Sequence, residues 1–122
     1  MLLRSVTRAL ACAALVLTAT AVSAQAFPTK TIKFLVPFPA GSATDVVGRH
    51  LADAMGKDLG QSIVVDNKAG AQGTIGANEV KNAAPDGYTL MVTTSTTQAA
   101  VVSLLKKVPY DPAKDFTPIG KI

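Results

Sequence analysis

The chain has 122 residues, a formal net charge of +4, and a single cysteine and a single histidine. This composition excludes a scaffold held by several disulfides, and it does not predict a metal site built from His and Cys ligands or any other cofactor site. The lysines are scattered, with one adjacent pair at Lys106–Lys107 and little aromatic interleaving, so nucleic-acid binding is disfavoured.

Residues 1–26 have the layout of a secretory signal peptide. Arg4 and Arg8 form a short basic region, residues 9–22 carry no charge, and small residues follow, so we expect cleavage after Ala24 or Ala26. A membrane anchor is the alternative, but the apolar segment 9–22, which precedes the small residues, is about 14 residues long and falls short of the roughly 20 that a spanning helix needs. We therefore expect export to a bacterial periplasm, with no membrane insertion of the mature chain.

Cys12 raises the alternative of a lipoprotein. Only three residues separate Cys12 from Arg8, too few for an apolar region ahead of a lipid-modified cysteine. We expect Cys12 to be removed with the signal peptide, so that the mature chain has no thiol. Removal of Arg4 and Arg8 leaves ten basic against eight acidic residues, a net charge of +2. The basic balance of the precursor therefore belongs partly to its signal.

The first predicted unit of the mature chain is a strand, a loop and a helix. Residues 31–36 form an apolar run that ends at two prolines, and a helix is predicted over 44–59 with Ser42 or Thr44 as its N-cap. On a helical wheel one face of this helix carries the apolar residues Val47, Leu51, Ala54 and Met55. The opposite, exposed face carries a ladder of alternating charges, Asp45, Arg49, Asp53 and Lys57.

Strands and helices continue to alternate along the chain. A strand is predicted over 62–66, a helix over 74–84 that buries only small residues, and a strand over 88–93. The hydroxyls of Thr94–Thr97 cap a third predicted helix, which ends near Lys106–Lys107. This alternation with short connections predicts a doubly wound parallel sheet. The last residues, 116–122, resemble the start of another strand, so we interpret the chain as the N-terminal portion of a longer protein.

Three residue patterns that suggest chemistry have simpler interpretations. Gly70, Gly73 and Gly76 open a helix after a strand, but their spacing is not Gly-x-Gly-x-x-Gly, so close helix packing is favoured over dinucleotide binding. His50 has no second His or Cys with which to share a metal. Ser95 lies among threonines with no His placed to activate it. The sequence therefore predicts neither a metal site nor an enzyme.

Two turns rich in hydroxyl groups, 39–44 and 94–97, are the best candidates for a binding site. Each follows a predicted strand and opens a helix, so both helix N-termini should meet at the carboxyl edge of the sheet, where ligands bind and anions are favoured. The first loop has no Lys, Arg, His or Cys, so a ligand there would be held by backbone amides and hydroxyls. Plain helix capping is the alternative use of these hydroxyls. Arg49 is a candidate counter-ion, but its place in the charge ladder favours a structural role.

The mature chain also carries short motifs in a characteristic order. They are Phe27-Pro28-Thr29-Lys30, Leu35-Val36-Pro37-Phe38-Pro39-Ala40-Gly41 with Asp45 and Arg49, Val65-Asp66-Asn67, Gly70-Ala71-x-Gly73-x-x-Gly76, Ala84-Pro85-Asp86-Gly87-Tyr88-Thr89-Leu90, Pro109-Tyr110-Asp111 and Asp115-Phe116-Thr117-Pro118-Ile119. In these motifs the chain resembles the periplasmic solute-binding receptors of tripartite tricarboxylate transporters, often called the Bug family. Two positions depart from the family pattern: Gly41-Ser42-Ala43-Thr44 replaces a more usual Gly-Gly-Ser/Thr, and Gln72 replaces a frequent Gly.

The resemblance implies an α/β fold like that of periplasmic binding proteins, the two-domain Venus flytrap, with residues 27–122 covering most of the first domain. Such receptors capture a small carboxylate-bearing metabolite between their domains and deliver it to membrane permease subunits. The resemblance places part of the pocket in the loop after the first strand and in the turn after the third. The expected ligand-binding residues are Phe38, Ala40, Gly41, Ser42, Thr44, Asp45, Thr94, Ser95 and Thr96. We expect a monomer, and a protein that reports ligand occupancy to a signalling system is the alternative function.

Overall fold

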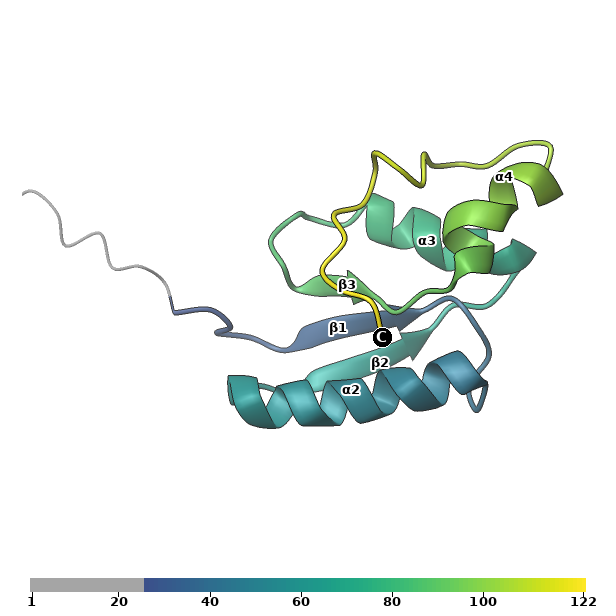
Figure 1. Cartoon of the computed structure of the whole chain (residues 1–122). Coiled ribbons are helices and arrows are strands. Elements are labelled where there is room, and N and C mark those ends of the chain that lie inside the picture. The colour runs from purple at the N-terminus through teal and green to yellow at the C-terminus, as the bar shows by residue number, and fades with distance from the viewer. Residues whose placement is uncertain (1–25) are drawn as a thin grey trace, which may run out of the picture.

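The computed structural model describes residues 26–122, in which three parallel strands carry helices on both faces (Figure 1). The predicted signal peptide lies outside this range apart from Ala26. The strands are β1 (Ile32–Val36), β2 (Ile63–Asn67) and β3 (Thr89–Met91), in the order β2-β1-β3. In register, Phe34 of β1 lies opposite Val65 of β2 and Leu90 of β3. The predicted strands are thus confirmed, with shifted ends.

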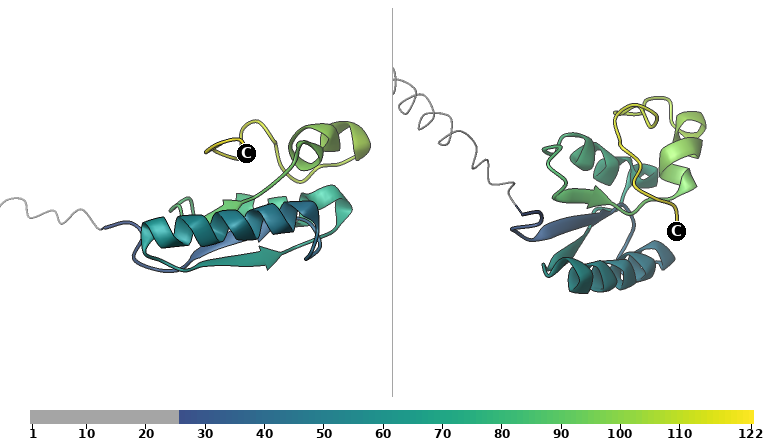
Figure 2. Two further views of the ribbon diagram at one scale, coloured as in Figure 1. Left: turned by 60° about the horizontal axis from the view of Figure 1, so that its bottom comes forward. Right: turned by 60° about the vertical axis from the view of Figure 1, so that its left-hand side comes forward.

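Helix α2 (Ala43–Leu59) covers one face of the sheet, and α3 (Thr74–Lys81) and α4 (Val101–Leu104) lie on the other. A short 3₁₀ turn (Ala71–Gly73) precedes α3. A π-helical turn (Thr96–Ala100) precedes α4. Figure 2 shows the sheet between the two layers of helices. The predicted doubly wound parallel sheet is therefore confirmed.

The alternation of β1 explains the two layers, because successive side chains of a strand point to opposite faces. One hydrophobic cluster joins the sheet to α2 and contains Ile32, Phe34, Val36, Ala52 and Val92. On the other face, a cluster of Ala77, Val101 and Tyr110 joins α3 to α4 and the segment that follows it. Lys33 also points to this second face, where its Nζ lies 2.9 Å from Asp66 and 2.6 Å from Glu79 of α3.

The buried face of α2 differs from the one predicted. Val47 is 43% exposed and Ala54 is exposed, whereas Gly48 and Ala52 are buried. A Cβ at position 48 would lie 3.2 Å from Cγ2 of Val36, so the helix lies very close to the sheet there. The wheel prediction holds for Leu51 and Met55, which pack against the core cluster, but it was wrong for Val47 and Ala54. It missed Gly48 and Ala52, because the close approach to the sheet needs the smallest residues.

Helix α3 packs against the sheet as predicted, through small residues. A Cβ at Gly76 would lie 2.6 Å from Cδ2 of Leu35 and 3.0 Å from Cβ of Pro37. Gly73 has a φ of 86° and lies directly against the Thr97 hydroxyl. The glycines of this segment therefore serve turn geometry and close packing, the interpretation favoured from their spacing.

The third helix and the C-terminal segment differ more from prediction. Ser95 already has helical dihedral angles (φ −57°, ψ −28°), and no side chain caps the π-helical turn that follows. Helix α4 ends at Leu104, before the lysine pair that was expected in its last turn. Residues 116–122 form no strand; the Phe116 ring packs edge-on against Tyr110.

Candidate functional site

The carboxyl ends of β1 and β3 adjoin at the point where the sheet changes winding direction. The chain leaves β1 for α2 on one face and leaves β3 for the π-helical turn on the other. In open α/β sheets this switch point is where ligands bind, since loops on either side separate and helix N-termini point into the gap. Both turns predicted to form a site are therefore brought to one edge.

Ser42 is the N-cap of α2, as predicted. Its Oγ accepts a hydrogen bond from the Asp45 amide at 3.3 Å, and its own amide donates to the Pro39 carbonyl at 3.2 Å. The Asp45 carboxylate turns back toward the loop and accepts a bond from the Gly41 amide at 2.8 Å. This is the reciprocal arrangement of a capping box, except that the carboxylate reaches the residue before the cap.

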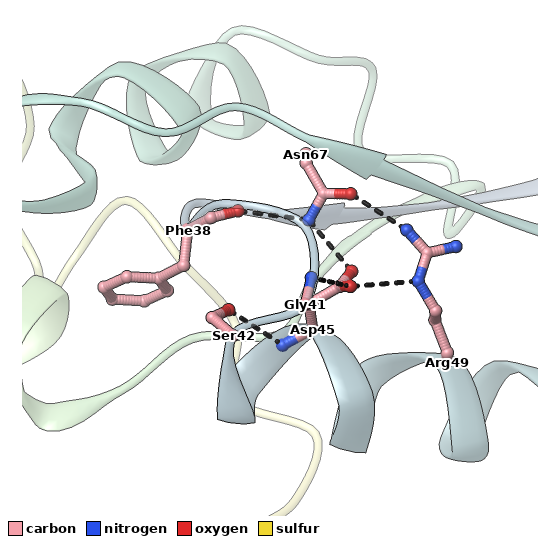
Figure 3. A network of polar contacts seen from close by, with 6 residues as sticks. All are labelled: Phe38, Gly41, Ser42, Asp45, Arg49 and Asn67. Atoms are coloured by element: carbon pink, nitrogen blue, oxygen red, sulfur yellow. Dashed lines mark hydrogen bonds and ion pairs between the residues drawn. The ribbon is translucent and has the colours of Figure 1, made fainter.

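Asp45 is the centre of a buried polar network (Figure 3). Although charged, the residue is only 2% exposed, and besides Gly41 its carboxylate accepts bonds from Arg49 Nε at 3.0 Å and Asn67 Nδ2 at 2.9 Å. The Arg49 bond, followed by those from the Gly41 amide and Asn67, lowers the pKa of Asp45 from 3.8 to about 2. Its predicted place on an exposed charge ladder was wrong, since these donors hold it inside the loop.

Arg49 and Asn67 close the network on its outer side. Arg49 is half exposed and donates from its second nitrogen to Asn67 Oδ1 at 3.0 Å, while Asn67 Nδ2 also donates to the Phe38 carbonyl at 3.1 Å. The expected structural role of Arg49 fits this geometry. Asn67 was not among the predicted site residues. Its signal was its position as the last residue of β2, at the same carboxyl edge of the sheet.

Several groups of the first loop have no partner among residues 26–122. Gly41, Ser42 and Asp45 use their amides within the loop, but the amides of Ala40, Ala43 and Thr44 donate to no described group. Gly41 has a φ of 81°, and nothing lies within 4 Å of where its Cβ would be. The loop thus presents free donors and open space at the positive end of the α2 dipole.

The second turn supplies a further unpaired group. Thr94 Oγ1 is buried and has no hydrogen-bond partner in the described part of the chain, and the same holds for Thr93 Oγ1 and Gln98 Oε1. Ser95 is exposed and Thr96 is half-buried, whereas Thr97 donates its hydroxyl to the Gln72 carbonyl at 3.1 Å. Capping therefore does not explain the Thr94 hydroxyl. A buried polar group left unpaired is costly, so the Thr94 hydroxyl is available for a partner other than the helix backbone.

Catalytic and metal chemistry find no support at this edge. Within residues 26–122 no group of three or more His, Cys, Asp or Glu side chains is placed to hold a metal ion, and His50 is exposed. Asp45, the one buried carboxylate in the described part of the chain, is already paired with Arg49. None of the helices between residues 26 and 122 has the length and apolar character needed to span a bilayer.

Comparison with known proteins identifies the family. Residues 47–122 match the model of the tripartite tricarboxylate transporter family receptor. The chain belongs to this receptor family. It is 42% identical over 102 residues to Protein BugT of Bordetella pertussis. The aligned region covers 83% of this chain and 31% of BugT. The resemblance inferred from the motifs is therefore confirmed.

Two solved structures that are similar to this chain carry small carboxylates. MatC from Rhodopseudomonas palustris with bound malate matches 75% of this chain with a TM-score of 0.73 and 48% identity. A second R. palustris protein, with adipate, matches 75% with a TM-score of 0.71 and 38% identity. Each match covers 31% of the solved chain. This receptor chain thus has the fold of periplasmic binding proteins and spans about a third of the length of the relatives it matches.

Proposed function

We propose that the chain forms one wall of a carboxylate-binding site in a receptor of a tripartite tricarboxylate-type transporter. The observation that carries this proposal is its 48% identity to a family member with bound malate. The free amides and the unpaired Thr94 hydroxyl at the switch point supply groups suited to such a ligand.

The chemistry of capture relies on many weak groups acting together. A helix dipole stabilises an anion by only about 0.3–1 kcal/mol at an exposed site, so α2 alone would hold a carboxylate loosely. Hydrogen bonds to charged groups contribute about 1.5–3 kcal/mol each. The amides of Ala40, Ala43 and Thr44 with the Thr94 hydroxyl are therefore the groups that we assign to the ligand, and no enzymatic step is required of them.

The remaining predicted residues have supporting places in this site. Phe38 and Ser42 shape the loop, Gly41 leaves room for the ligand, and Ser95 and Thr96 lie within the second turn. Asp45 holds the loop through its bond from the Gly41 amide and does not face the ligand, because its carboxylate would repel an anionic ligand.

The cellular setting follows from the sequence and the family. We propose that residues 1–26 direct export to the periplasm, that residues 27–122 belong to the first of two domains that close on the ligand, and that the loaded receptor docks on membrane permease subunits as a monomer. The signal-peptide layout and the family description support this setting.

Substitution Thr94→Val in the full-length receptor tests the site. Since the hydroxyl has no partner within the described chain, its loss should leave the melting temperature unchanged or higher. Affinity for malate or adipate, measured by calorimetry, should fall about tenfold, the loss of one hydrogen bond to a charged group.

Thr93→Val is the matched control, because it removes a neighbouring buried, unpaired hydroxyl that lines a groove on the α3 face instead. Its affinity should equal that of the unmodified receptor. Equal affinities for all three proteins would reject the assignment of Thr94, and binding of neither acid by the unmodified receptor would reject the proposed ligand class.

A further inference from the structure

Asn67 ties the loop after β1 to the neighbouring strand β2 through both ends of its side chain. Its Nδ2 donates to the Phe38 carbonyl at 3.1 Å and to Asp45 Oδ1 at 2.9 Å, while its Oδ1 accepts from Arg49 at 3.0 Å. The carboxamide is the short side chain that offers two donors and an acceptor at once. Neither an aspartate nor a leucine could replace all three bonds.

These ties hold the loop from the side away from β3. Strand β2 lies on the opposite edge of β1 from β3, so Asn67 and Arg49 fasten the loop from the outside. Figure 3 shows the Phe38 ring and Arg49 on opposite sides of the loop. The ties from Asn67 and Arg49 thus leave the side of the loop toward β3, the other neighbour of β1, free of these two side chains.

The Asp45 carboxylate makes this fastening depend on Asn67. A buried carboxylate that loses a donor keeps the cost of its desolvation, so the loop would rearrange to bring Asp45 to water. The Gly41 amide, held at 2.8 Å by the same carboxylate, would be released with it. The loop would then no longer be held in a fixed position relative to the amides of Ala43 and Thr44 at the start of α2.

We propose that Asn67 is a positioning residue of the carboxylate site, which keeps loop 38–44 in the geometry that receives the ligand before the ligand arrives. The inference rests on the proposed function, since it gives Asn67 a role in that same site. Holding a binding loop in its bound form lowers the cost of ordering it during association. Asn67 therefore acts on affinity without touching the ligand.

The test compares Asn67→Ala with Asn82→Ala in the full-length receptor. Asn82 is an exposed asparagine that donates to the Asn78 carbonyl at the end of α3, so it controls for loss of a carboxamide. Asn67→Ala should weaken malate or adipate binding about tenfold or more, and Asn82→Ala should not change it. Unchanged affinity in Asn67→Ala, with the unmodified receptor binding either acid, overturns the inference and leaves the proposed function intact.

A second measurement needs no ligand. Hydrogen exchange of the Gly41 amide in the free receptor should speed up at least about tenfold in Asn67→Ala, because local opening exposes it. The Val92 amide, bonded to the Leu35 carbonyl in the sheet, should keep its rate. Loss of protection at both amides would indicate general destabilisation, and retained protection at both would show that Asn67 does not position the loop. Either outcome rejects the inference, even if neither acid binds to the receptor.

Asn67→Asp supplies a pH readout that a purely structural role would not give. Among residues 26–122, the charged side chains hydrogen-bonded to Asn67 are Asp45 and Arg49, both on α2. The introduced carboxylate would face the Asp45 carboxylate, which raises the pKa of the introduced group, and the Arg49 guanidinium, which lowers it. Affinity relative to the unmodified receptor should therefore recover as the pH falls and the introduced carboxyl becomes a donor. A ratio that is independent of pH would contradict the proposed bond.

Discussion

At the scale of single residues, Asp45 shows that a charged residue in a helical ladder can belong to the interior. The i,i+4 spacing with Arg49 is real, since Arg49 Nε lies 3.0 Å from Asp45 Oδ2. The sequence pattern does not reveal that the preceding loop folds over this carboxylate and that Asn67 reaches it from another strand. Such long-range partners depend on strand order, which local periodicity does not encode.

The same network predicts how stability depends on pH. The folded-state pKa of Asp45 is about 2, below its ordinary value of 3.8, so its stabilising effect is present above about pH 4. That effect is lost as the pH falls from about 4 through 2. Asp45→Asn should therefore destabilise the protein at neutral pH, and its deficit should shrink across this window.

Urea unfolding of both proteins from pH 6 to pH 2 measures this difference. Asp53→Asn is the control, since Asp53 pairs with Lys57 on the same helix but both side chains are at least 70% exposed. A constant deficit for Asp45→Asn at all pH values would contradict the assigned network.

At the scale of elements, the sequence predicted which segments form strands and helices better than it predicted how they pack. The three strands and α2 were found because their apolar runs and caps are local signals. The packing face of α2 was found only in part, through Leu51 and Met55. Gly48 and Ala52 were missed because they carry little hydrophobic signal yet allow the closest approach. The hydroxyl cluster after β3 was interpreted as a helix cap, although Ser95 is already helical and the Thr94 hydroxyl has no hydrogen-bond partner among residues 26–122.

Close packing of α3 gives a prediction about one glycine. Gly76→Ala would place a Cβ 2.6 Å from Leu35 Cδ2 and 3.1 Å from the Lys68 carbonyl oxygen, and Leu35 is fully buried. Overpacking costs about 1–3 kcal/mol, against a gain of about 1 kcal/mol in helix propensity. The free energy of unfolding should therefore fall by up to about 2 kcal/mol.

Chemical denaturation of Gly76→Ala and Gly120→Ala tests this packing. Gly120 is a suitable control because nothing lies within 4 Å of its Cβ position and its backbone is unstrained. A Gly76→Ala protein as stable as the control, or more stable, would show that α3 can move away from the sheet at no cost.

At the scale of the whole molecule, residues 26–122 form a three-stranded sheet with a groove beside one edge strand. Strand β3 lies at an edge, with no further strand paired to it among residues 26–122. Beside it runs a groove of about 850 Å³, whose walls include Leu90, Met91 and Phe116. The relatives are about three times as long. The family could be recognised from the sequence because its motifs occur in order along residues 27–119.

This geometry predicts that residues 26–122 alone are a poor receptor. A carboxylate held only by the loop after β1 and by Thr94 keeps water on its other side, where solvent screens the dipole and hydrogen-bond terms. Binding must also offset several kcal/mol of lost translational and rotational freedom. We expect malate and adipate to bind this segment no tighter than roughly millimolar, and a full-length relative to bind at least about a hundredfold more tightly. Calorimetry on both proteins gives the comparison, after a cooperative melt has shown that the segment is folded. Micromolar binding by the folded segment would mean that the amides and hydroxyls at this one sheet edge suffice, and enclosure by the rest of the receptor would then be unnecessary for capture.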